Sequence, residues 1–75
     1  MNIADTLIHV EETLGLKERE TLAESIREIP GVIAPRFNQG QDHLLLVAFD
    51  PAGIQSNDLL NSVRNKGYHA QLVAL

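Results

Sequence analysis

Residues 44–49 form the longest purely apolar run of the chain, Leu-Leu-Leu-Val-Ala-Phe, and this run constrains the fold more than any other segment. It is far shorter than the ~20 residues that span a bilayer, and it predicts the centre of a β-strand over residues 43–50. Successive side chains of a strand point to opposite faces, so this strand is apolar on both. Such a strand is expected at a central position of a sheet.

Three more strands are expected around it. Residues 3–10 predict a first strand, in which Ile8 and Val10 face inward. Residues 32–37 predict a second strand, and residues 68–75 a last one. The second strand contains Pro35, which has no N–H for a neighbouring strand, so we expect it at an edge of the sheet.

Two amphipathic helices separate these strands. The first is predicted from Leu22, Ile26 and Ile29, which recur at helical spacing. It begins near Gly15 and ends at Pro30-Gly31. The second helix is predicted from a different set of residues: Ser56 as its N-cap, Leu59, Leu60 and Val63 on its apolar side, and Gly67 after its last turn.

The order of the elements predicts the fold class. Strand, helix, strand, strand, helix and strand with right-handed crossovers give an α+β fold, the ferredoxin-like βαββαβ sandwich. Its four-stranded antiparallel sheet has the strand order 4-1-3-2 and carries two helices on one face. The second strand then lies at an edge, as Pro35 requires. Residues 1–75 are expected to form a single domain.

Composition excludes several classes of function. The chain has no cysteine, which rules out disulfides and thiolate metal sites. The net charge is −4, and the six Lys and Arg residues are scattered, so a nucleic-acid partner is not expected. The first ten residues contain no basic region before an apolar run, which argues against a secretory signal. We therefore expect a cytoplasmic protein that does not insert into membranes.

Three segments together resemble the heavy-metal-associated domain family of copper chaperones and metal-transporting ATPases. They read "IPGV" after the first helix, then "VAFDP", then "LLNSVRNKGYHA". The resemblance extends over about the whole chain and implies the same ferredoxin-like fold. In that family the metal binds to Gly-Met-x-Cys-x-x-Cys in the first loop. Counting back from Pro30-Gly31 places the two cysteine positions on Gly15 and Glu18. The motif is therefore degenerate, and thiolate binding of copper(I) is ruled out.

Histidines offer a different metal site. His9 ends the first strand and His69 begins the last, and these strands are neighbours in the predicted sheet. We expect the two imidazoles to lie close together on the open face, within reach of Glu18. They would suit Zn(II), Ni(II), Co(II) or Cu(II). The strand that His43 opens is expected to run parallel to the first strand, which would place His43 at the far end of the sheet. Alternatively, His9 and His69 are two polar residues on a half-solvated face of the sheet and bind no metal.

An apolar surface is expected on the sheet face that no helix covers. Its members are Leu7, Leu44, Leu46, Ala48 and Val73, a set that we call the open-face patch. A small monomer seldom exposes a contiguous patch of this kind, which favours a protein partner or a homodimer. Scattered surface leucines are also normal, so an ordinary solvated face remains an alternative.

Catalysis has little support in the sequence. The serines lack a Ser-His-Asp arrangement, and no glycine-rich phosphate loop occurs. The leading hypothesis is a non-enzymatic binding or adaptor domain that acts by protein association. The alternative is a metal-binding or metal-delivery protein that uses His9 and His69 with a divalent transition metal in place of the cysteines.

Overall fold

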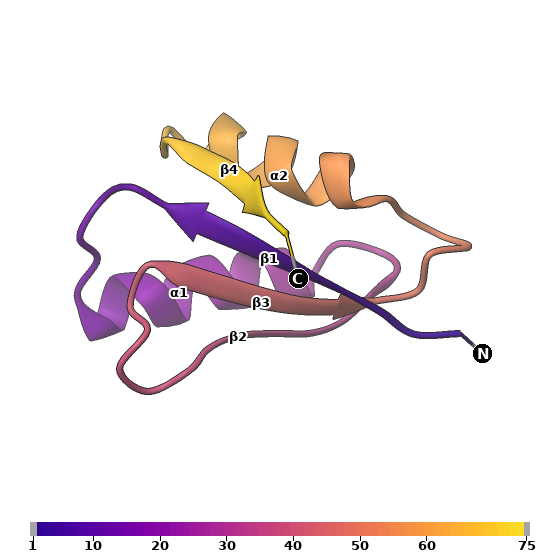
Figure 1. The fold of residues 1–75 in the computed structure, drawn as a ribbon, viewed down its shortest axis with the longest axis horizontal. Coiled ribbons are helices and arrows are strands. Elements are labelled where there is room, and N and C mark those ends of the chain that lie inside the picture. The colour runs from indigo at the N-terminus through magenta and orange to yellow at the C-terminus, as the bar shows by residue number, and fades with distance from the viewer. Residues whose placement is uncertain (1, 75) are drawn as a thin grey trace.

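The computed structural model describes residues 2–74, which form a four-stranded antiparallel sheet and two helices (Figure 1). The elements are β1 (Ala4–Val10), α1 (Leu16–Arg27), β2 (Val32–Phe37), β3 (Leu44–Phe49), α2 (Ser56–Asn65) and β4 (Ala70–Val73). The strand order is β2-β3-β1-β4, which is the predicted order 4-1-3-2 read from the other side. The predicted fold class is therefore confirmed.

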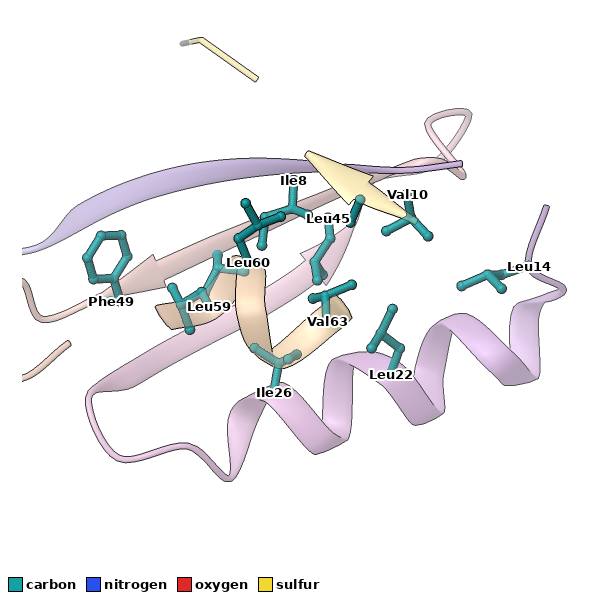
Figure 2. Packing of buried hydrophobic residues seen from close by; sticks show 12 residues of the cluster. Ile8, Val10, Leu14, Leu22, Ile26, Leu45, Phe49, Leu59, Leu60 and Val63 are labelled. Carbon is teal, nitrogen blue, oxygen red and sulfur yellow. The ribbon is translucent and has the colours of Figure 1, made fainter. Parts of the chain in front are cut away.

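The core lies between the sheet and the helices. In β1 and β3 alternate side chains are buried, as the period of a strand requires. They pack against the apolar stripes of α1 and α2 (Figure 2). The buried set is Ile8, Val10, Leu14, Leu22, Ile26, Leu45, Val47, Phe49, Leu59, Leu60, Val63 and Ala70. Both helices thus cover one face of the sheet and leave the other face open.

Acidic side chains cap the first turn of each helix. Glu18 Oε1 accepts a hydrogen bond from the Gly15 N–H at 3.4 Å, with Gly15 as the N-cap of α1. In α2 the N-cap is Gln55, and its N–H donates to Asp58 Oδ2 at 3.1 Å. The expectation that Ser56 is the N-cap was wrong, because Ser56 is already the first helical residue. Neither helix in the described part of the chain is long and apolar enough to cross a membrane.

The turn after α1 joins the two halves of the chain. Gly31 has φ +97°, a backbone conformation that L side chains rarely adopt. Its carbonyl accepts a hydrogen bond from the Asp50 N–H at 2.8 Å, and a Cβ built on it would lie 3.0 Å from Ile54 Cγ2. The start of β2 is thereby held against the loop between β3 and α2.

The edge position of β2 agrees with the prediction from Pro35. This strand pairs with β3 alone, and Pro35 is buried opposite Val47. The pairing shifts register between Val32 and Ala34. At the other edge, β4 is only four residues long. The last residue of the predicted strand 68–75, Leu75, lies outside the described residues.

Candidate functional site

The loop between β1 and α1 has a helix cap where the resemblance places the two cysteines. Gly15 is extended at φ −70° and ψ 169°, and Glu18 lies in the first turn of α1. The hydrogen bond from the Gly15 N–H to Glu18 satisfies one of the free N–H groups that a helix N-terminus presents. A carboxylate and a backbone N–H offer no soft ligand, so this loop end is built for helix stability.

Glu12 connects this loop to the start of β4. Its Oε2 is 2.8 Å from His69 Nδ1, and its two carboxylate oxygens accept from the His69 N–H at 2.9 and 3.1 Å. The hydrogen bond to Glu12 raises the pKa of His69, and that same bond lowers the pKa of Glu12. The His69 side chain is 79% exposed. The two residues form a hydrogen-bonded clasp across 57 positions of sequence, which is an ion pair when His69 is protonated.

His9 has a neighbouring histidine, His43, that was not paired with it from the sequence. The rings of His9 and His43 stack, with centroids 5.7 Å apart and planes 16° from parallel. The expectation that His43 lies at the far end of the sheet was wrong, because β3 runs antiparallel to β1. The beginning of β3 therefore lies beside the end of β1. In the β1–β4 ladder, the residue opposite His9 is Gln71.

The predicted metal ligands His9, His69 and Glu18 have three different sets of neighbours. His9 lies against His43, His69 is bound by Glu12, and Glu18 caps α1. Within residues 2–74, no group of three or more His, Cys, Asp or Glu side chains could hold a metal ion. A metal site of this three-residue composition thus stays a prediction without an assembled centre.

The open-face patch spans three strands on the side away from the helices. The strand ladders pair Leu7 with Leu46 and with Val73, and they pair His9 with Leu44 and Asp5 with Ala48. All members of the patch are half-buried in the single chain. Along β1 and β3 the patch residues alternate with core residues, which fixes their side of the sheet, and Val73 in β4 is opposite Leu7.

Two opposite charges border this patch. Asp5 extends from β1, and Arg36 extends from β2 opposite Leu46. With Ala34, Leu46 and Ala48 they line a shallow hollow of about 130 Å³. Both are exposed, and neither forms an ion pair with another described residue. The charges flank the central strand β3, the acid on one side and the base on the other.

A larger hollow of about 470 Å³ lies between α1 and the turn that joins β2 to β3. Leu16, Ala23 and Phe37 contribute apolar surface to it. Arg19 also lines it and donates to the Leu14 carbonyl at 2.6 Å. This hollow could not be predicted from the sequence, because it depends on how residues 38–42 fold back toward the helix. No local pattern in the sequence indicates that packing.

The fold is shared by other solved structures, two of which are a copper-binding domain and a Cu(I)-loaded domain. Oxidized MerP from Ralstonia metallidurans CH34 superposes with a TM-score of 0.83 at 16% identity, covering 97% of this chain and 100% of MerP. The N-terminal domain of a potential copper-translocating P-type ATPase from Bacillus subtilis, in its Cu(I)-loaded state, gives 0.81 at 18%, covering 95% and 88%. A copper-binding domain from HMA7, a P-type ATPase, gives 0.81 at 17%, covering 93% of each chain.

The fold is that of heavy-metal-associated domains. No family model and no curated protein sequence matches the chain. The resemblance found in the sequence is confirmed for the architecture, and the absence of cysteine leaves the Cys-x-x-Cys motif missing. At these identities the likeness extends to the fold alone.

Proposed function

We propose that this protein is a non-enzymatic association module that pairs with a second copy of itself through the open sheet face. The observation that supports this most directly is the open-face patch, a contiguous apolar surface on the side of the sheet without helices. Burying apolar surface contributes about 25 cal/mol per Å² removed from water. Side chains that are half-buried in one chain still have area to lose in a second layer.

The arrangement of charge favours a second copy over an unrelated partner. A two-fold symmetric interface must be self-complementary, because the same surface occurs on both sides. Asp5 and Arg36 lie on opposite sides of β3. A two-fold axis parallel to β3, between two stacked sheets, places the β1 side of one copy over the β2 side of the other. Each Asp5 then faces the partner's β2 side, and each Arg36 faces the partner's β1 side.

The offset of these two residues along β3 is small enough for contact. Asp5 is opposite Ala48 and Arg36 is opposite Leu46, two residues apart on the same strand. At about 3.4 Å per residue this is roughly 7 Å, which the long arginine side chain can span. Stacked sheets also lie about 10 Å apart, a distance that interdigitating leucines fill.

Charge reversal tests the proposal. We expect sedimentation velocity to show dimers for the unaltered chain and a shift toward monomer for Asp5→Arg and for Arg36→Asp, since each places like charges in contact. The double variant restores the opposite pairing and should recover the dimer. Lys17→Asp, an equal charge change on the exposed side of α1, is the matched control and should leave the dimer intact.

The outcomes distinguish a second copy of the chain from a different protein as the partner of the open sheet face. A chain that stays monomeric up to millimolar concentration refutes self-association and leaves a different protein as the partner of the face. Failure of the double variant to recover the dimer that the single variants lost would refute the two-fold geometry. Equal loss in Lys17→Asp would mean that net charge, rather than this interface, controls association.

A further inference from the structure

We propose that His9 and His43 form a two-imidazole site for a divalent transition metal, with Zn(II) as the reference ion. The site lies where the end of β1 meets the beginning of β3. It differs from the cysteine positions of the first loop and from the pair of His9 with His69 predicted from the sequence. It does not depend on self-association.

His43 is oriented as a metal ligand should be. Its Nδ1 lies 2.7 Å from the Val10 carbonyl oxygen, and the Val10 N–H donates to the His43 carbonyl at 2.8 Å. A carbonyl oxygen only accepts, so Nδ1 carries the hydrogen. The neutral ring therefore keeps its lone pair on Nε2. A hydrogen bond from the second ring nitrogen to a backbone carbonyl is the usual support of a metal-bound histidine.

His9 has a ring nitrogen without a partner. Among residues 2–74, its Nδ1 is the one buried side-chain nitrogen or oxygen atom that makes no hydrogen bond. A buried polar atom left unpaired costs about 1–3 kcal/mol, so such atoms call for a bound water, an ion or a functional role. Rotation of this ring about χ2 breaks no hydrogen bond at Nδ1, in contrast to the ring of His43.

The separation of the rings allows a shared ion. Zinc binds imidazole nitrogen at about 2.0–2.1 Å, which places the ion about 3.2 Å from each ring centroid. Two rings on one ion can then have centroids up to roughly 6.4 Å apart, and the observed separation is 5.7 Å. At that separation the two centroids subtend about 126° at the ion, near the tetrahedral range. The nearly parallel planes mean that one ring must turn, and His9 is the free one.

Two imidazoles select the class of metal. Borderline ions such as Zn(II), Ni(II) and Cu(II) bind imidazole, whereas Mg(II) and Ca(II) require oxygen ligands. No third protein ligand is gathered in the described residues, so water or a ligand from another molecule completes the coordination. The site therefore leaves coordination positions open, unlike the closed four-ligand sites of structural zinc.

The test is a zinc titration of the full chain, followed by the imidazole ¹⁵N signals. We expect the His9 and His43 resonances to move together and to saturate at one ion per chain, while His69 does not move. His9→Gln and His43→Asn should each weaken binding about tenfold or more, a loss comparable with that from altering a metal site's supporting residues. His69→Gln is the matched control and should bind as the unaltered chain does.

Two results would overturn the site. One is a titration without saturation below about 1 mM zinc; the orphaned Nδ1 is then satisfied by water alone. The other is movement of His69 in step with His9, or equal loss in His69→Gln, which would return the site to the pair predicted from the sequence. The wild-type NMR shifts decide the matter even where a variant fails to fold.

Discussion

Replacing Gly31 by alanine tests the contact between the turn after α1 and the loop that precedes α2. Gly31 and Gly67 both have φ +97°, so alanine has the same backbone strain at either position. They differ in their surroundings. A Cβ on Gly31 would lie 3.0 Å from Ile54 Cγ2 and 3.3 Å from Ile54 Cβ, whereas a Cβ on Gly67 meets nothing within 4 Å. Gly67→Ala is therefore the matched control.

The two costs can be worked out separately. Holding an L residue in the left-handed backbone conformation destabilises the folded state by about 1–2 kcal/mol. Alanine also lowers the entropy of the unfolded chain, which offsets about 0.4–1 kcal/mol of that loss. Gly67→Ala should therefore lose about 1 kcal/mol of unfolding free energy. Crowding a packed site costs about 1–3 kcal/mol more, so Gly31→Ala should lose roughly 2–4 kcal/mol. The free energy of unfolding of a native protein is about 5–15 kcal/mol. The loss expected for Gly31→Ala is therefore a substantial fraction of the total stability.

Urea denaturation measures both losses, and a double-mutant cycle assigns the difference. Ile54→Ala removes Cγ2, the nearest atom at 3.0 Å, and keeps Cβ at 3.3 Å. In that background Gly31→Ala should cost less than in the unaltered chain, and at least as much as Gly67→Ala. A coupling of at least about 0.5 kcal/mol between Gly31 and Ile54 is expected for residues in contact. The reasoning is refuted if Gly31→Ala costs no more than Gly67→Ala, or if removing the Ile54 side chain leaves its cost unchanged.

Two further predictions concern the first loop. The raised pKa of His69 makes its pairing with Glu12 stabilising below the ordinary histidine pKa of 6.5, and this is lost as pH rises through the raised value. The lowered pKa of Glu12 makes the same pair stabilising above 4.5, and this is lost as pH falls through the lowered value. The clasp therefore contributes most between pH 4.5 and 6.5, and NMR titration of Glu12→Gln should show the pKa of His69 return toward its ordinary value. Gly15→Cys combined with Glu18→Cys should introduce tight Cu(I) binding, measured by competition with a colorimetric chelator, because two thiolates are soft ligands. The extended Gly15 backbone accepts a side chain.

Each of these has an outcome that would contradict it. An unchanged pKa of His69 in Glu12→Gln would show that the short contact does not control the proton. For the cysteines, Lys17→Cys combined with Glu20→Cys keeps the same spacing two residues further along the chain, within α1. Equal Cu(I) affinity in that control would mean that any two nearby thiols suffice and that the loop position carries no special geometry.

The architecture could be predicted from the sequence because each of its elements has a recognisable local residue pattern. The alternation in β1 identified Ile8 and Val10 as core residues, and both are 0% exposed. The helical spacing of Leu22 and Ile26 identified the buried side of α1. Pro35 indicated the edge strand through the missing N–H alone. In each case, a local pattern or a single residue with one strong physical constraint decided the assignment.

The candidate sites were harder to predict because they depend on strand direction and long-range contact. β2 and β3 are joined by a short turn that reverses the chain, so β3 runs opposite to β1 and brings His43 to His9. The clasp between Glu12 and His69 joins positions that no spacing rule connects. The N-cap at Gln55 follows from backbone dihedral angles, and a nearby serine was the better candidate by residue type.

The two edges of the sheet limit how copies of this molecule can assemble. Pro35 and the register shift interrupt the backbone hydrogen-bonding edge of β2, and β4 offers only four residues. Both features blunt the strand-by-strand templating that leads to fibres. One sheet face is occupied by the helices, so a second sheet can stack only on the other. In the proposed dimer, stacking there would use up the last free face, so assembly through the sheet would terminate at two molecules instead of propagating.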